Sequence, residues 1–472
     1  MTTSLTENSI ENVFISQRQN TNTIANTTAS ERIDKLKKIQ GYLMSHLDEV
    51  QQVMFKDFSK PGSEALLGEI YGINTELKHT CKHLKGWMKP QRVPTPLSVI
   101  GTSGYIKHEA KGNILIISPW NYPLSLAIKP LISSIAAGNV AILKPSELTP
   151  NTAAFIKRMI EDLFPSNEIA VFEGDASVAT ELLKLPFNHI FFTGAPAIGK
   201  VVMRAAAEHL ASVTLELGGK SPSIIDETAD IKKIAAITAW GKCINNGQTC
   251  IAPDYVFVHE SRKDAFIEAY SDCIKKMYNA DDQGVENSDS YARIVNERHF
   301  GRVKGYLDDA VAKGAKVVLG GKTIADQNFI EPTVLTNVSD DMKVMQDEIF
   351  GPILPIMTYS NRQEVIDYVN SKEKPLALYI NSNNSKNVDF FLNNTTAGDT
   401  IINDVLLQFG NPEIPFGGVN NSGIGKSNGY FGFQEFSNMR GVMKRNFGDM
   451  KFIYPPYTDR VKKIVNAFVK YF

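Results

Sequence analysis

From about residue 113 onward, short apolar runs alternate with longer segments whose apolar residues recur at helical spacing. The first five runs lie at residues 114–117, 140–143, 169–172, 190–192 and 213–217. Strands that alternate with helices of this kind predict a parallel sheet with helices on both faces. Ligands of such sheets bind at the carboxyl ends of the strands, so we expect the chemistry in the loops that follow these runs.

A second alternating series begins at residues 223–226 and continues to about Asp404. It predicts a second α/β domain with its own sheet. Its later strand-like runs lie at residues 255–258, 316–319, 353–359 and 376–380.

The two ends of the chain differ from this pattern. Residues 1–30 are rich in Thr, Asn and Ser, and we expect them to be loosely held ahead of a helical region at 31–87. The N-terminus lacks a basic patch followed by an apolar run, so no signal peptide is expected. The tail at 461–472 mixes Lys with Val, Ile and Phe at partly helical spacing, which favours a surface or partner contact.

Composition narrows the function classes. The chain has 472 residues, of which 43% are hydrophobic, and its 50 basic and 51 acidic residues nearly cancel. This balance argues against nucleic acid as the main partner, because nucleic-acid binding needs a basic surface. No run of apolar residues is long enough to span a membrane. Four cysteines give no disulfide framework, so we expect a reducing, cytoplasmic location.

Cys250 follows a polar, turn-prone run. A helix predicted over about 230–244 ends at Asn-Asn-Gly-Gln, a sequence that should leave the Cys250 sulfur near a cleft. A thiol in a cleft can act as a nucleophile through its thiolate. From the local sequence alone, a small buried hydrophobe is an equally good interpretation. That interpretation is the preferred one for Cys81, Cys243 and Cys273.

Glu216 ends the predicted strand at 213–217 and precedes Gly218 and Gly219. It is either a general base whose pKa is raised by partial burial, or half of an ion pair with a nearby lysine. Asn121 lies in Ser-Pro-Trp-Asn-Tyr-Pro, directly after the strand at 114–117. Its amide can donate to a developing oxyanion, but the commoner role of an isolated Asn is to cap a helix.

A glycine-containing turn connects the run at 190–192 to the next predicted helix. The N-terminus of that helix would favour phosphate. The stretch from Gly194 to Lys200 fits part of a P-loop, but Val201 stands where Ser or Thr would hold Mg²⁺. A second Gly-Lys pair precedes Ser427, with Asn420 where the first glycine is required. Both NTPase interpretations therefore fail at an essential residue, which leaves a dinucleotide phosphate site.

His79-x-Cys81-x-His83 has the residue types of a metal site. On a helix, however, positions i, i+2 and i+4 do not converge on one face, so no metal site is expected.

Together, the motifs resemble the aldehyde dehydrogenase superfamily, and they occur in family order along nearly the whole chain. The separation of Glu216 from Cys250, 250 − 216 = 34 residues, is typical of that family. The matching motifs are P-W-N-[FY]-P at Asn121, K-P-S-E at Lys144 and Glu147, the turn at Gly194 and Gly199, L-E-L-G-G-K at Glu216, G-Q-x-C at Cys250, E-I-F-G-P from Glu348, and P-F-G-G from Pro415.

The K-P-S-E variant, the short N-terminal region and Y-P-P-Y at 454–457 are most similar to the class 3 branch, whose members are dimers that use NAD and often NADP. The resemblance implies an α/β fold with a Rossmann-like doubly wound cofactor domain, a second α/β catalytic domain and a small oligomerisation arm. The implied division is 1–95 and 111–217 for the dinucleotide-binding domain, 218–400 for the catalytic domain, 96–110 and 401–440 for the bridging and oligomerisation segments, and 441–472 for the tail.

The same resemblance implies NAD(P)-dependent oxidation of an aldehyde to the carboxylic acid. Cys250 is the implied nucleophile, Asn121 the oxyanion donor and Glu216 the base that hydrolyses the thioester. The carboxylate of Glu147 would oppose a 2′-phosphate, which favours NAD over NADP. Ala195 is a departure, because relatives commonly have Ser or Asn there. The implied cofactor residues are Trp120, Lys144, Glu147, Thr193, Gly194, Gly199, Glu348 and Phe350.

Three function classes remain open at this point: an aldehyde-oxidising enzyme, a P-loop-like NTPase and a non-catalytic dinucleotide-binding scaffold. Val201 opposes the NTPase, and a scaffold would not need Cys250 together with Glu216. CoA-acylating dehydrogenases are a nearer alternative, but a retained hydrolytic base favours acid formation. We therefore expect an aldehyde dehydrogenase that acts as a homodimer on a small-molecule aldehyde.

Overall fold

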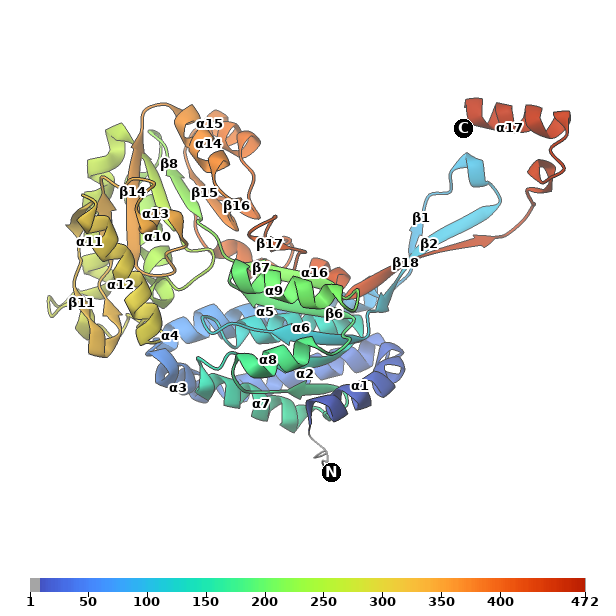
Figure 1. Ribbon diagram of the computed structural model, residues 1–472, viewed down its shortest axis with the longest axis horizontal. Coiled ribbons are helices and arrows are strands. Elements are labelled where there is room, and N and C mark those ends of the chain that lie inside the picture. Colours follow the sequence, from blue (N-terminus) through green and yellow to red (C-terminus); the bar gives the residue numbers. More distant parts are fainter. Residues whose placement is uncertain (1–8, 472) are drawn as a thin grey trace.

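The computed structural model describes residues 9–471. Two α/β lobes lie side by side, and a long arm projects from one of them and carries the C-terminal helix at its tip (Figure 1). The expectations for the two chain ends also cover the first eight residues and Phe472, which lie outside the described residues.

The first lobe contains a six-stranded sheet in the order β17-β7-β6-β3-β4-β5. All neighbours are parallel except β17 and β7. The five apolar runs predicted as strands are strands, which confirms that part of the sequence analysis. The strands are β3 (Asn113–Ile117), β4 (Val140–Lys144), β5 (Ile169–Val171), β6 (His189–Gly194), β7 (Ser212–Leu217) and β17 (Gly423–Ile424).

The strand order places a topological switch point between β3 and β6. From β3 the chain adds β4 and β5 on one side, and then returns to add β6 and β7 on the other. The loops after β3 and β6 therefore diverge and leave a crevice at the carboxyl ends, which is where doubly wound sheets bind ligands. Those two loops contain Asn121 and Ala195.

Helices cover both faces of this sheet. Ile114 and Ile116 pack against one layer, whereas Leu115, one residue between them, packs against the other. The first layer contains α2 (Ala29–Ser45), α3 (Leu47–Phe58), α5 (Gly72–Trp87), α6 (Ser125–Ala137), α7 (Pro150–Leu163) and α16 (Gly429–Glu435). The second contains α1 (Ile10–Ala25), α8 (Ala176–Leu183) and α9 (Pro196–Ala207).

Helix α1 corrects the expectation that residues 1–30 are loosely held. Val13 and Phe14 are buried against the sheet, and the Gln17 amide donates to the carbonyl of Ala141 at 3.0 Å. The polar composition of this segment does not predict a helix. One or two apolar residues per turn are nevertheless enough to bury one face of a helix against a sheet.

The second lobe contains a seven-stranded sheet in the order β10-β13-β14-β9-β8-β15-β16, and the later predicted runs are again strands. Its strands are β8 (Pro222–Ile225), β9 (Tyr255–His259), β10 (Lys316–Leu319), β13 (Thr333–Thr336), β14 (Ile353–Tyr359), β15 (Ala377–Asn381) and β16 (Asp399–Ile402). Its other elements are α10 (Ile231–Cys243), α11 (Lys263–Tyr278), α12 (Glu297–Ala312), α13 (Lys343–Gln346), α14 (Arg362–Ser371), α15 (Ser385–Asn394) and the hairpin of β11 (Thr323–Ile324) and β12 (Phe329–Ile330).

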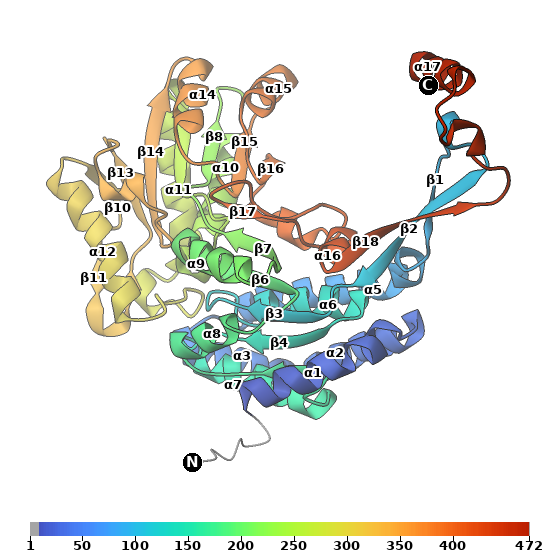
Figure 2. The same ribbon diagram turned by 45° about the vertical axis from the view of Figure 1, so that its right-hand side comes forward.

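The arm is an antiparallel sheet of β1 (Gln91–Val93), β2 (Thr102–Ala110) and β18 (Ser437–Arg445). It extends away from both lobes and ends near α17 (Asp459–Tyr471), which forms from the predicted tail (Figure 2). None of the described residues of α17 is buried. No described helix has the length and apolarity needed to cross a membrane. Oligomerisation through the arm stays a prediction.

Candidate active site

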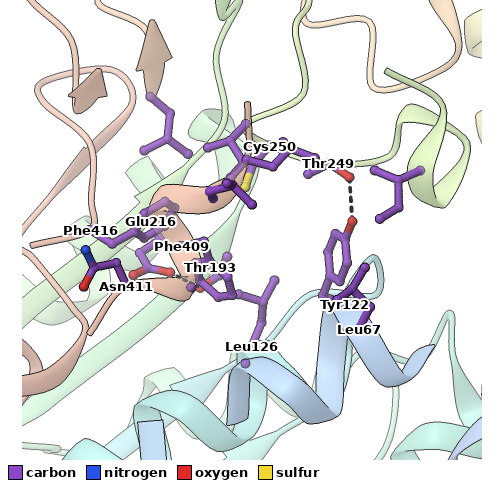
Figure 3. Close-up of a pocket in the computed structure, with 18 of the residues that line it drawn as sticks. Leu67, Tyr122, Leu126, Thr193, Glu216, Thr249, Cys250, Phe409, Asn411 and Phe416 are labelled. Atoms are coloured by element: carbon purple, nitrogen blue, oxygen red, sulfur yellow. Dashed lines mark hydrogen bonds between the residues drawn. The ribbon is translucent and has the colours of Figure 1, made fainter. Parts of the chain in front are cut away.

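A cavity of about 630 Å³ opens where the two lobes meet. Its walls come from β7, α6 and the segment before α5 on one side, and from α10, the loop after it and residues 406–416 on the other. Cys250 and Glu216 both line it, although they belong to different lobes (Figure 3). A cavity of this size is typical of a small-molecule site.

The loop that carries Cys250 has an unusual backbone. Asn245, Asn246 and Gly247 have φ values of 53°, 56° and 73°, so three consecutive residues are left-handed. Asn and Gly are the residues that tolerate this conformation. The Asn246 amide donates to the carbonyl of Ala292 at 2.8 Å, which ties the turn to the second lobe. The polar run predicted to expose Cys250 thus bends the chain back toward the cavity.

The surroundings of the Cys250 sulfur disfavour the thiolate. Burial raises the pKa of the thiol, and the neighbouring carboxylates of Glu348 and Glu216 raise it further. Since only the thiolate is nucleophilic, Cys250 must lose its proton before it attacks. Of the other cysteines, Cys243 is buried and Cys81 and Cys273 are partly buried against hydrophobic cores, as expected for structural residues.

Glu216 lies near the carboxyl end of β7 and is buried. The Ser427 hydroxyl donates to one carboxylate oxygen, and the Thr193 hydroxyl donates to the other at 3.4 Å. Burial raises the pKa of the Glu216 carboxyl to about 7, against the opposing effect of Ser427 and the charge of Lys129. Among the described residues no lysine forms a salt bridge with Glu216, so the ion-pair interpretation is not supported.

Asn121 lies beside the Cys250 loop. Its side-chain amide donates to the carbonyl of Gln248 at 3.0 Å, which uses one of the two N–H groups. The described residues offer no second acceptor to that nitrogen, so its other N–H is unpaired, although buried Asn121 is not among the residues that line the cavity. Helix α6 begins at Ser125 without a side-chain cap, so Asn121 does not have the capping role that was the alternative.

Several residues expected to bind the cofactor converge near the switch point. The ring of Trp120 packs edge-on against that of Phe350, at 5.4 Å between centroids. Glu348 approaches the end of β7 so closely that a Cβ on Gly218 would lie 2.1 Å from its carboxylate. A side chain at position 218 would force that carboxylate to move, which accounts for the glycine after Leu217 in the motif. Burial and the charge of Asp254 raise the pKa of Glu348 to about 8.

The remaining cofactor candidates lie along the same edge. Buried Lys144 ends β4 and forms an ion pair with Glu147 at 3.1 Å. Gly194 ends β6, and Gly199 lies in the first turns of α9 against Leu217. Ala195, the departure noted in the sequence, caps α9 without a side-chain hydrogen bond.

The histidines of the candidate metal motif do lie together. His79 and His83 stack on one face of α5 with ring centroids 4.5 Å apart, and Cys81 is not part of the group. Glu413 joins them, with the three ligand atoms within 4.8 Å of one another. The carboxylate of Glu413 is exposed and nothing else marks a cation there, so we assign no metal to the group.

Comparisons with known proteins identify the family. The family model described as "Aldehyde dehydrogenase family" matches residues 2–442. The chain belongs to the aldehyde dehydrogenase family. A "Putative aldehyde dehydrogenase AldX" of Bacillus subtilis is 46% identical, over 92% of this chain and 97% of the relative. A "4,4'-diaponeurosporen-aldehyde dehydrogenase" of Staphylococcus aureus is 42% identical, over 98% and 100%. The "Aldehyde dehydrogenase family 3 member B2" of Mus musculus is 39% identical, over 90% and 88%.

Solved structures agree with this assignment. The substrate-bound state of Staphylococcus aureus AldH superposes with a TM-score of 0.92 at 41% identity, over 98% of this chain and 100% of that chain. A betaine aldehyde dehydrogenase of the same species, solved with NAD⁺, gives 0.83 at 27% identity, over 93% and 88%. A glyceraldehyde-3-phosphate dehydrogenase of Methanocaldococcus jannaschii, solved with NADP, gives 0.84 at 25% identity, over 94% and 95%. The predicted resemblance, α/β fold and enzyme class are confirmed.

The sequence does not reveal the groups that support this site. Buried Lys60 and Glu69 and partly buried Glu64 are charged residues that contact the Asn121 and Cys250 loops. Tyr122 and Thr249, which are joined by a hydrogen bond of 2.9 Å, line the cavity (Figure 3). Burial of a charge cannot be read from a helical pattern of apolar residues. The one available signal was Lys60 directly before Pro61 and Gly62, where the sequence breaks the helical pattern between α3 and α4.

Proposed function

We propose that this aldehyde dehydrogenase oxidises an aldehyde to the carboxylic acid with NAD(P)⁺, through a covalent intermediate on Cys250. The observation that carries the proposal is the shared cavity. It holds one thiol, Cys250, and one carboxylate, Glu216, whose pKa of about 7 suits a general base at neutral pH. This arrangement favours the enzyme over the scaffold and NTPase alternatives.

The chemistry begins with loss of the Cys250 proton and attack of the sulfur on the aldehyde carbon. The carbonyl oxygen becomes an oxyanion, which the free N–H of Asn121 and the backbone N–H of Cys250 are suited to hold. Oxidation of this thiohemiacetal leaves a thioester on Cys250. Glu216 then takes a proton from water, the resulting hydroxide attacks the thioester carbon, and the acid leaves as the thiolate is restored.

The residues at the switch point fit a dinucleotide. The carboxyl ends of β3 and β6 diverge there, the N-terminus of α9 points at the crevice, and Gly218 keeps a Cβ away from the Glu348 carboxylate. We propose that Lys144 and Glu147 hold the adenosine ribose, that Thr193, Gly194 and Gly199 form the phosphate turn, and that Glu348, Trp120 and Phe350 hold the nicotinamide end. The bound nicotinamide supplies the hydride acceptor.

Replacement of Asn121 by alanine is expected to lower kcat by about 10²–10³, the usual cost of one oxyanion donor. The substitution removes a donor that matters most in the transition state, so KM for the aldehyde should change much less than kcat. Steady-state kinetics with purified protein measure both. Asn20→Ala, on the far side of the lobe in α1, is the matched control. Wild-type kcat in Asn121→Ala would remove Asn121 from the mechanism.

The cavity also suggests the kind of aldehyde. Glu216 is the single charged side chain among the described residues that line it, and the walls are otherwise mostly apolar. We propose that the substrate has an apolar body, since burial of such a body is favourable and a cationic aldehyde would find only the catalytic carboxylate. The apolar lining residues include Leu67, Leu126, Trp240, Ile251, Leu407 and Phe409.

Glu147 should discriminate between the two cofactors. Its carboxylate, about half exposed beside Lys144, would repel a 2′-phosphate. Glu147→Gln removes this charge and is expected to lower KM for NADP⁺ by about tenfold, the effect of roughly 1.4 kcal/mol, with little change for NAD⁺. KM measured for both cofactors tests this. An equal change for NAD⁺ and NADP⁺ would place Glu147 away from the 2′ position.

The domain roles follow from the same assignment. We propose that residues 1–95 and 111–217 form the dinucleotide-binding domain and that 218–400 form the catalytic domain. We also propose that the segments 96–110 and 401–440 join two copies into a homodimer, and that the enzyme works in the cytoplasm. Light scattering of the purified chain tests the dimer.

The experiment that tests the proposed function is formation of NAD(P)H from a panel of aldehydes. The panel pairs apolar aliphatic and aromatic aldehydes with a cationic aldehyde of similar size. We expect turnover with the apolar members and kcat/KM at least about tenfold lower for the cationic one. Absence of turnover with every aldehyde, in protein that binds NAD⁺, would support the scaffold alternative.

A further inference from the structure

Three charged side chains, two fully buried and one partly buried, lie just outside the cavity and have no part in the chemistry above. They belong to the segment between α3 and α5, which contains α4 (Gly62–Ala65) and a π-helical turn (Leu66–Tyr71). Lys60 and Glu69 are fully buried, and Glu64 is partly buried. Turns of π-helix often occur near functional sites, and this one contains Glu69, while Glu64 lies in α4 and Lys60 lies just before it.

Lys60 and Glu69 hold the Asn121 loop. Their side chains form an ion pair at 3.1 Å, and Lys60 also donates to the backbone carbonyl of Asn121 at 3.3 Å. The other carboxylate oxygen of Glu69 accepts the backbone N–H of Ser125 at 2.7 Å. The ammonium group of Lys60 lies 4.0 Å from the centre of the Tyr122 ring. The pair therefore fixes the loop at Asn121 and again four residues later.

Glu64 holds the Cys250 loop and links it to the first. Its carboxylate accepts the backbone N–H of Asn245 at 2.8 Å. The Asn245 amide then donates to the carbonyl of Asn121 at 2.9 Å and to that of Gln248 at 3.1 Å. The Asn121 carbonyl thus has two donors, Lys60 and Asn245, one from each side. The peptide group of the Asn121 carbonyl is therefore held by residues of both lobes.

We propose that Lys60, Glu64 and Glu69 are positioning residues that fix the Asn121 amide relative to Cys250. The inference rests on the proposed function, in which that amide holds the oxyanion. Stability alone does not account for these charges, because a buried ion pair is often no more stable than an apolar pair of the same volume. Oxyanion stabilisation, by contrast, depends on donors that are fixed before the reaction, and small displacements are costly.

The geometry separates this role from catalysis. Neither Lys60 nor Glu69 lines the cavity, and Glu64 faces a different depression of the surface. Apart from the Lys60–Glu69 pair and the Lys60 ammonium beside the Tyr122 ring, their contacts are with the backbone of the two loops. Their effect on the reaction should therefore pass through Asn121 and change kcat, while leaving KM for NAD⁺ unchanged.

The test uses Lys60→Met with Glu69→Gln, which removes both charges and leaves an acceptor for Ser125, and Glu64→Leu, which removes the acceptor for Asn245. Each is expected to lower kcat by about tenfold or more with KM for NAD⁺ within about twofold. Glu64→Gln keeps an acceptor oxygen and should restore wild-type kcat. Lys35→Met, which breaks a partly buried ion pair with Glu168 in the same lobe, is the matched control.

The same changes are then made in the Asn121→Ala protein. If the three residues act through Asn121, their substitutions cause no further loss of kcat in the Asn121→Ala protein, because the two effects are then not additive. Full additivity, or wild-type kcat in both charge variants, would overturn the inference. Wild-type kcat in Asn121→Ala would instead overturn the proposed mechanism. If the Lys60 and Glu69 double variant does not fold, the comparison of Glu64→Leu with Glu64→Gln decides the question.

Discussion

Replacement of Cys250 by serine is expected to lower aldehyde turnover by on the order of 10⁴ or more, as is usual when a covalent nucleophile is removed. A serine hydroxyl fits the same space but ionises far less readily than a thiol, and the cavity already disfavours a negative charge. Burial and the carboxylates of Glu348 and Glu216 raise the pKa of the Cys250 thiol, and the same surroundings would act more strongly on an alkoxide. NAD(P)H formation measures the loss.

The control for this variant is Cys273→Ser, in α11 of the second lobe, where the partly buried thiol packs against a hydrophobic core. It should retain wild-type turnover. Cofactor binding, followed by fluorescence, should be unchanged in Cys250→Ser, which separates loss of the nucleophile from loss of the fold. Turnover by Cys250→Ser at the wild-type rate would rule out the covalent route.

Most of the strands could be predicted because they are short apolar runs buried on both faces. In β3, Ile114, Leu115 and Ile116 are all fully buried, so the run is continuous and stands out from its neighbours. The helix α1 could not be predicted in the same way. Its Thr- and Asn-rich sequence is typical of loops, and it forms because Phe14 and Gln17 find partners on a sheet that begins some hundred residues later.

The site residues could be named from motifs, but their physical states could not. Nothing local to Glu216 predicts a pKa of about 7, because burial between two lobes raises the pKa and Ser427, over two hundred residues away, opposes that rise. The sequence suggested a role for Ser427 only within a P-loop, and that P-loop lacks the required first glycine. The charges at Lys60 and Glu69 were invisible for the same reason, since their partners are backbone groups of a distant loop.

Glu216→Gln is expected to stop the enzyme after the first half of the reaction. Glutamine keeps the shape and can still accept the Ser427 hydrogen bond, but it cannot take a proton from water. Oxidation should therefore proceed once per active site, and hydrolysis of the thioester should fall by about 10²–10⁴, the usual contribution of a general base. Rapid mixing should show a burst of NAD(P)H close to the enzyme concentration, and intact-protein mass spectrometry should show the acyl group on Cys250.

The pH dependence provides an independent test of the same residue. Because the pKa of Glu216 is raised to about 7, the carboxylate is protonated, and inactive as a base, below that pH. Wild-type thioester hydrolysis should therefore rise as the pH increases through about 7 and level off above it. In Glu216→Gln the residual rate should lose this inflection and rise only as hydroxide becomes available. A variant that keeps both the wild-type rate and the inflection would show that another group is the base, and Glu348, with a pKa of about 8 and a place beside Cys250, would be the next to replace.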